Sequence, residues 1–298
     1  MTSTAIALVT ALLCLVALPW LLRSWRGFDR SPQTGLMVWG ATCAIGWLAA
    51  VVTFLGVGLG YPHESVLRAL FLFLEHLGDG HPLRGLGVSE VVGLSVAFDV
   101  IVVMLGALIV TASRIWSVRS QQRAVLDLVA EMTVDHEGVC LLRHSYPMAY
   151  FVPGDGGRVV LSTGAIDLLS ESELRAVIAH EIGHRQGRHG AILVPLQVMA
   201  SFVSFLPLAR FAPTVMRAYL EMSADDYSRS QEPTGSLGTA LSKASLFQPP
   251  PVGALNISDG LIERRINRLS TSPKGGRVAS LASGMVALGF VCLLTLSH

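Results

Sequence analysis

The sequence alternates between long apolar runs and segments that hold most of its charges. Four runs are strongly apolar, and only one of them contains a charged residue, Asp99. Each run is long enough to cross about 30 Å of hydrocarbon as a helix. We therefore predict four transmembrane helices, at residues 5–22, 36–60, 91–113 and 278–298. The first three form one unit, residues 1–113, with an external loop at residues 61–90.

A more polar segment, residues 114–277, separates the third predicted span from the fourth. Arginines follow both the first and the third span, at Arg23, Arg26, Arg30, Arg114, Arg119 and Arg123. Because basic residues favour the cytoplasmic side, we predict that residues 114–277 form a cytoplasmic domain and that both termini lie outside. The first run has no basic residue before it, which argues against a cleaved signal peptide.

The composition agrees with a membrane protein and excludes other classes. Hydrophobic residues make up 51% of the chain and charged residues 14%, which is too apolar for an ordinary soluble domain. A net charge of +1 without a basic cluster argues against a nucleic-acid partner. Three of the four cysteines lie in apolar runs and Cys140 stands alone, so we expect no disulfide framework. The expected environment is the lipid bilayer, and the sequence leaves the oligomeric state open.

The strongest chemical signal is the run SESELRAVIAHEIGHRQGRH, which begins at Ser170. Ser170 and Glu173 have the spacing of a capping box, so we predict that a helix begins there. On this helix His180 and His184 share one face, and each can offer a ring nitrogen to a single Zn²⁺. Glu181 beside them is a candidate general base for the water that attacks a peptide carbonyl. The alternative interpretation is an ordinary helix with two surface histidines.

A catalytic zinc of this kind needs a third protein ligand, and a downstream acidic segment can supply it. Glu221 and Asp225 are four residues apart, so on a helix they face the same way. We predict that Glu221 completes the ligand set for one Zn²⁺ per chain. Asp225 is then expected to hydrogen-bond the far nitrogen of a ligand histidine, whereas Asp226 points about 100° away around the helix. A solvated acidic stretch is the alternative.

These residues lie in segments that resemble a known family. YPMAYFVPG, RVVLSTGAIDLL, ELRAVIAHEIGH, LPLARFAPTVMRAYLEMSADD and ERRINRL resemble the BlaR/MecR-type integral-membrane zinc metallopeptidases and, more distantly, the HtpX and CAAX-protease class. The resemblance implies a mainly α membrane protein with an inserted α+β zincin-like metallopeptidase domain. It also implies that His180, His184 and Glu221 bind zinc, that Glu181 is the catalytic base, and that Asp225 supports a ligand histidine without touching the metal. The β-lactam-sensing members carry an extracellular penicillin-binding domain that is not found in this sequence, so we do not expect antibiotic sensing.

Substrate contacts are predicted from strands and from single polar residues. Residues 149–152 and 158–162 read as two strands joined by a glycine-rich turn. An edge strand near the metal can hold an extended peptide, and a hairpin that only covers the helix is the alternative. Candidates for contacting the substrate or the oxyanion are Tyr227, His189 and Arg264. The resemblance suggests active-site contacts for Arg264, Arg265 and Arg268, while binding to anionic lipid explains these arginines equally well.

Residues 191–209 carry no charge and directly follow the motif helix. A single membrane crossing here would separate Glu221 from His180, which would prevent them from sharing a metal. Pro195, Gln197 and Pro207 interrupt the segment. We therefore predict a buried or membrane-dipping segment that leaves and returns on one face.

Two features have open interpretations. Asp99 within the third span fits either an ion path or a structural acid bonded to another helix. In the external loop, His63, His76 and His81 fit either a metal or ligand sensor or scattered surface histidines.

The sequence thus predicts a membrane-embedded zinc endopeptidase acting on a cytoplasmic or membrane-proximal protein. The resemblance suggests a transcriptional repressor in a signalling pathway as the substrate, and membrane-protein quality control is the alternative. A different class, a non-catalytic membrane receptor with a structural zinc, is disfavoured by Glu181, because a structural site gains nothing from a general base.

Overall fold

The computed structural model describes residues 3–59, 71, 74–75, 77–79, 87–129, 139–152, 157–245 and 257–271. The helices of the membrane part are α1 (Ser3–Leu12), η1 (Leu13–Ala17), α2 (Leu18–Leu22), η2 (Arg26–Arg30), α3 (Pro32–Gly58) and α5 (Val88–Val129). The strands are β1 (Val139–Leu142), β2 (Ala149–Val152) and β3 (Arg158–Ser162). The remaining helices are α6 (Thr163–Leu168), α7 (Glu171–Gln186), α8 (His189–Phe202), α9 (Pro207–Gln231), α10 (Ser236–Ser245) and α11 (Ile257–Ser270).

Three helical stretches are long and apolar enough to cross a membrane: Thr4–Leu22, Pro32–Gly58 and Val91–Val118. They correspond to the first three spans predicted from the sequence. The π-helical turn η1 joins α1 to α2, so the first stretch is one continuous rod. The predicted fourth span, residues 278–298, and the three histidines of the external loop lie outside the described residues.

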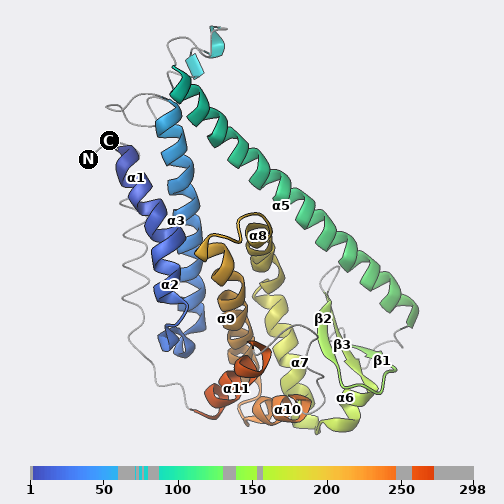
Figure 1. Cartoon of the computed structure of the whole chain (residues 1–298). Coiled ribbons are helices and arrows are strands. Elements are labelled where there is room, and N and C mark those ends of the chain that lie inside the picture. Colours follow the sequence, from blue (N-terminus) through green and yellow to red (C-terminus); the bar gives the residue numbers. More distant parts are fainter. Residues whose placement is uncertain are drawn as a thin grey trace.

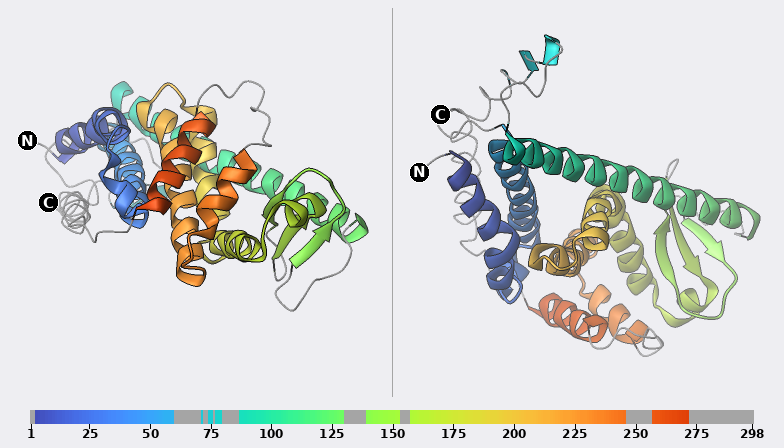
Figure 2. Two further views of the ribbon diagram at one scale, coloured as in Figure 1. Left: turned by 90° about the horizontal axis from the view of Figure 1, so that it is seen from below. Right: turned by 45° about the horizontal axis from the view of Figure 1, so that its top comes forward.

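Helix α3 contacts both α1 and α5 (Figure 1). The end of α3 meets α5 at two glycines, Gly58 and Gly93. A Cβ added to Gly58 would stand 2.2 Å from the backbone nitrogen of Leu94, and a Cβ added to Gly93 would stand 2.7 Å from the backbone nitrogen of Gly58. Only glycine permits so close a backbone approach. From this contact α5, which is 42 residues long in total, runs obliquely away from α3 toward the sheet (Figures 1 and 2).

The uncharged residues 191–209 form a helical hairpin. Helix α8 ends at Phe202, a short turn follows, and α9 begins with Pro207 at its first position, where proline is well tolerated. Helix α9 packs back against α8, and the pair contacts α3 and α5 (Figure 1). The segment therefore turns back on itself instead of forming one continuous helix, in agreement with the prediction that it returns to the side from which it starts.

One hydrophobic core joins the apolar helices to the hairpin. Trp39 of α3, Met199 of α8, Tyr219 of α9 and Phe28 of η2 are all buried in the same cluster. Fully burying side chains of this size contributes about 1.5–3 kcal/mol each. Helix α9, on which Glu221 lies, is thus fixed directly to the helices of the membrane part.

A small mixed sheet packs against α7. Its strand order is β1-β3-β2, with β1 parallel and β2 antiparallel to β3. Strands β2 and β3 match the two predicted strands, whereas β1 was not predicted. Apolar residues of one sheet face, including Val159 and Leu161, pack on Leu174, Ile178 and Ile182 of α7. This contact places β2 beside the motif helix.

Candidate active site

The motif helix α7 begins as its sequence predicts. The Ser170 hydroxyl accepts from the backbone of Glu173, and the Glu173 carboxylate accepts from the backbone of Ser170, which completes the capping box. Lys243 of α10 also donates to Glu173 at 2.6 Å. The fixed start sets the register that brings His180 and His184 to one face of α7.

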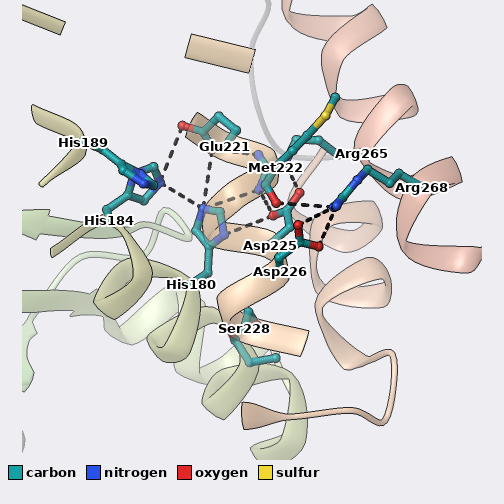
Figure 3. A network of polar contacts seen from close by, with 11 residues as sticks. His180, His184, His189, Glu221, Met222, Asp225, Asp226, Ser228, Arg265 and Arg268 are labelled. Atoms are coloured by element: carbon teal, nitrogen blue, oxygen red, sulfur yellow. Dashed lines mark hydrogen bonds and ion pairs between the residues drawn. The ribbon is translucent and has the colours of Figure 1, made fainter. Parts of the chain in front are cut away.

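The structure brings together His180 and His184 of α7 and Glu221 of α9 (Figure 3). The two Nε2 atoms lie 3.2 Å apart, and the Glu221 carboxylate oxygens lie 3.5 Å from His180 Nε2 and 3.6 Å from His184 Nε2. Ligand atoms about 2.0–2.1 Å from a tetrahedral Zn²⁺ are separated by roughly 3.3 Å. These two nitrogens and one carboxylate therefore fit zinc in both chemistry and spacing.

Gly183 explains how α9 comes so close to α7. A Cβ at this position would stand 3.1 Å from the Cβ of Tyr227 and 3.2 Å from the Cα of Ala224. Because Gly183 has no side chain, the backbone of α9 can approach α7 closely at a point between His180 and His184. Without this close approach the short Glu221 side chain would not reach both imidazoles.

On one flank of the cluster, His180 is backed by a buried charged network (Figure 3). Its Nδ1 lies 3.1 Å from Oδ1 of Asp225, whose side chain is 0% exposed. Arg265 of α11 donates to both Asp225 oxygens, at 2.6 and 2.9 Å, and its Nη1 lies 3.0 Å from Glu221. Arg265 thus holds the two acids of α9 in a common orientation.

On the other flank, His184 is backed by a neutral imidazole. His184 Nδ1 and His189 Nδ1 lie 2.8 Å apart, a hydrogen bond in which one ring donates to the other. The turn before α8 creates this contact, because Arg188 adopts a left-handed backbone with φ of 47°. Gly187 leaves space for the His189 ring, which would collide with a Cβ there at 2.1 Å.

The charges of the cluster favour a cation between the ligand atoms. Burial disfavours the charged form of His180, but its contacts with Asp225 and Glu221 outweigh burial and raise the His180 pKa to about 9. Burial also opposes ionisation of Glu221, yet hydrogen bonds from His180 and His184 and the charge of Arg265 lower the Glu221 pKa below its usual range. Burial and His184 lower the pKa of His189 to about 4, so His189 is neutral at pH 7.

Glu181 lies beside the cluster at the edge of the sheet. Burial is the main cause that raises the pKa of Glu181, and its carboxylate accepts a hydrogen bond from the backbone of Phe151 in β2. A cavity of about 350 Å³ opens next to Glu181 and His180. Strand β2 forms part of its wall together with apolar residues of α6, α7 and α10, including Leu168, Val177, Leu237 and Leu241.

The other candidates from the sequence have different surroundings. The Tyr227 hydroxyl accepts from Gln186 at 2.9 Å, and His189 contacts His184 as described. Arg264 does not join the cluster, because its guanidinium makes a bidentate pair with Asp29 of η2. Asp226 turns away from His180, as expected, and binds Arg268 at 2.6 Å.

The sequence predicted the partners of the site only in part. Of the three arginines for which the resemblance suggested active-site contacts, Arg265 is the one that reaches Glu221 and Asp225, and Asp29 was not predicted at all. Asp29 lies in the turn after the first span and is bound by α11. The only sequence signal for these contacts is the arginine-rich run ERRINRL, which does not reveal which arginine faces which acid.

Comparison with known proteins agrees with this geometry. Residues 116–243 match Peptidase family M48, a segment that includes the sheet, the histidine motif and Glu221. No solved structure matches the chain. Peptidases of this family are metal-dependent and typically use zinc. Residues 116–243 are therefore similar to Peptidase family M48, and this match supports a metallopeptidase hydrolase.

Proposed function

We propose that this protein is a membrane-embedded zinc endopeptidase that cleaves a cytoplasmic or membrane-proximal protein. The observation that carries the proposal is that ligand atoms of His180, His184 and Glu221 lie within 4.8 Å of one another, next to the half-buried side chain of Glu181. The M48 match supports the same chemistry independently of the distances.

In this function His180, His184 and Glu221 hold one Zn²⁺, with Asp225 and Arg265 fixing two of these ligands from behind. Bound zinc supplies a Lewis acid that polarises the peptide carbonyl and makes water a stronger nucleophile. Glu181 takes the proton from the attacking water and later delivers it to the leaving amide nitrogen. The raised pKa of Glu181 favours the first step, because it makes this carboxylate a stronger base than an exposed glutamate.

The substrate is proposed to bind as an extended strand along β2. Among the described strands β2 pairs only with β3, so its second edge carries no strand. The backbone hydrogen bond between Phe151 and Glu181 links this edge to the general base. A peptide added there would send alternate side chains toward the apolar cavity. We therefore expect a preference for an apolar residue next to the scissile bond.

The active site is proposed to face the cytoplasm. The turn η2 follows the first apolar helix, carries Arg26 and Arg30, and is bound by Arg264 of α11. The turn and the metal cluster therefore lie on the same side of any membrane that α1–α3 cross. Because basic loops favour the cytoplasmic side, both are assigned there.

Of the two alternative functions, only the receptor is distinguished from a peptidase by Glu181. A receptor with a structural zinc would need the metal ligands but not the base. Cleavage of a transcriptional repressor and membrane-protein quality control both need the base, and they differ in the identity of the substrate. The specific resemblance to BlaR/MecR-type proteins favours the repressor.

The test uses the full chain purified in detergent, with zinc content and casein hydrolysis measured on the same sample. Glu181→Gln should keep about one zinc per chain and lose at least about a hundredfold in hydrolysis. His180→Ala should lose zinc, because only two of three ligands remain. Glu171→Gln, an exposed acid on the same helix, is the matched control and should behave like the unchanged protein.

Three results would contradict the proposal. Full zinc in His180→Ala would refute the ligand assignment. Undiminished hydrolysis in Glu181→Gln would refute its role as the base, and zinc binding without any hydrolysis in the unchanged protein would favour the receptor.

A further inference from the structure

The α8–α9 hairpin, defined by residues 189–221, has an exposed apolar tip. Phe202 is 53% exposed and Phe205 is 79% exposed, and no charged residue occurs between 191 and 209. Leaving such side chains in water forgoes about 1.5–3 kcal/mol each compared with burial. The tip is therefore unsuited to an aqueous surface.

Three contacts between the hairpin and the apolar helices fix its height. Near the tip, Trp47 Nε1 donates to Met199 Sδ at 3.1 Å. Lower on α9, the rings of Phe211 and Trp20 pack edge to face at 5.0 Å. A further two turns down, Tyr219 packs against Gly35, near the start of α3.

These contacts place the tip beside the middle of α3. Trp47 lies about 22 Å along the helix axis from Pro32, the first residue of a helix about 40 Å long. The start of α3 is level with Tyr219, and Glu221 follows Tyr219 by two residues. The hairpin thus extends from the metal cluster, at the end of the apolar helices, to their midpoint.

The backbone of the tip is suited to hydrocarbon. Lipid offers no hydrogen bonds, so polar backbone groups at this depth must be paired internally. Two amides of the turn meet this condition: Val203 N donates to Met199 O at 3.0 Å, and Leu206 N donates to Val203 O at 2.9 Å. The Ser201 hydroxyl also bonds within α8, to Gln197 O at 2.9 Å.

We propose that the α8–α9 hairpin is inserted into the bilayer from the cytoplasmic side, with Phe202 and Phe205 in contact with lipid near the midplane. The insertion sets the height of the metal cluster, because Glu221 stands about 21 Å along α9 from Pro207. His180, His184 and Glu221 are then held at the inner surface of the membrane. This assignment of depth does not depend on peptidase activity.

Its consequence for the substrate rests on the proposed function. The metal cluster would reach cleavage sites close to a membrane anchor of the substrate and would not reach distant ones.

The test measures depth with a nitroxide label on the full chain in phosphatidylcholine–phosphatidylglycerol vesicles. The four cysteines are replaced, and a labelled cysteine is introduced at Phe205. Three exposed positions calibrate the scale: Leu48 in the middle of α3, Met37 near its start, and Ser242 on α10. The ratio of collisions with oxygen to collisions with a water-soluble nickel chelate rises with depth in hydrocarbon.

The label at Phe205 should give the same ratio as the label at Leu48, at least about tenfold above Ser242. A ratio equal to that of Ser242 would show a water-exposed hairpin and overturn the proposal. A ratio equal to that of Met37 would limit the tip to the interface and overturn the midplane depth. Phe202→Cys repeats the measurement if the label at 205 disturbs folding. The same measurement on the Glu181→Gln protein should give the same depth, because insertion does not depend on peptidase activity. A failure of the insertion proposal is therefore distinguishable from a failure of the proposed function.

Discussion

The two histidines of the metal cluster are supported in opposite ways. His180 is supported by a buried acid of α9, Asp225, and by Arg265 of α11. His184 is supported by the neutral imidazole of His189, five residues further along the chain at the start of α8. Both arrangements meet the same need, because a metal-bound imidazole keeps its proton on the far nitrogen and requires an acceptor there. The neutral support is built locally by the α7–α8 turn. The charged support exists only when distant segments assemble.

The largest effect is expected from the charged flank. Asp225→Asn should lower zinc affinity by about tenfold to a hundredfold, because an amide stabilises the imidazole of His180 less than a carboxylate does. It also leaves Arg265 buried without its main partner, so the melting temperature should fall. Zinc affinity is measured by competition with a chelating dye.

Asp226→Asn is the matched control for this substitution. Its side chain is 40% exposed and binds Arg268, so the change in zinc affinity should stay within about threefold. If the two substitutions exchange ranks, Asp226 orients the histidine, and the helical register of α9 that turns Asp225 toward His180 is refuted.

A smaller effect is expected from the neutral flank. His189→Leu removes the hydrogen-bond partner of His184 and should lower zinc affinity by about tenfold, less than Asp225→Asn, because neutral hydrogen bonds are weaker than charge-assisted ones. His189→Gln, which restores an acceptor, should recover part of the loss. His144→Leu, an exposed histidine outside the cluster, serves as the control. Equal affinity for His189→Leu and the unchanged protein would mean that His184 needs no support.

The smallest effect is expected at the outer end of the charged network. Asp29→Asn weakens the pair with Arg264, while Arg265 and Arg268 still anchor α11. Zinc affinity should fall by no more than about threefold, and stability by about 1 kcal/mol. Exchanging the charges, with Asp29→Arg and Arg264→Asp together, should restore both. Arg30→Gln on the same turn is the control, and a loss as large as that of Asp225→Asn would mean that the network acts as one unit.

The parts of the molecule that the sequence predicts well are those with local signals. Apolar runs predicted the three described spans, and the Ser170 capping box predicted the start of α7. The strands at residues 149–152 and 158–162 followed from their residue types and the turn between them. Helical spacing also predicted that Glu221 and Asp225 share a face, and the structure brings both to His180.

The remaining contacts depend on geometry without a local signal. The role of His189 is set by the left-handed backbone of Arg188, a conformation that the adjacent Gly187 would have been expected to adopt instead. Arg264 and Arg265 are neighbours in sequence but turn to opposite partners, Asp29 and Asp225. Such choices follow from where α11 docks, which no pattern within the run ERRINRL specifies.

The shared core has a practical consequence for anyone who wishes to prepare the catalytic part alone. The segment that matches Peptidase family M48 starts at residue 116, yet Tyr219 and Met199 within it are packed against Phe28 and Trp39. A truncation that begins after the third span would strip these partners away and expose an apolar surface along α8 and α9. It would also remove Asp29, the anchor of Arg264. The folding unit therefore extends beyond the segment that matches Peptidase family M48. Soluble fragments of that segment should aggregate, whereas the full chain in detergent should not.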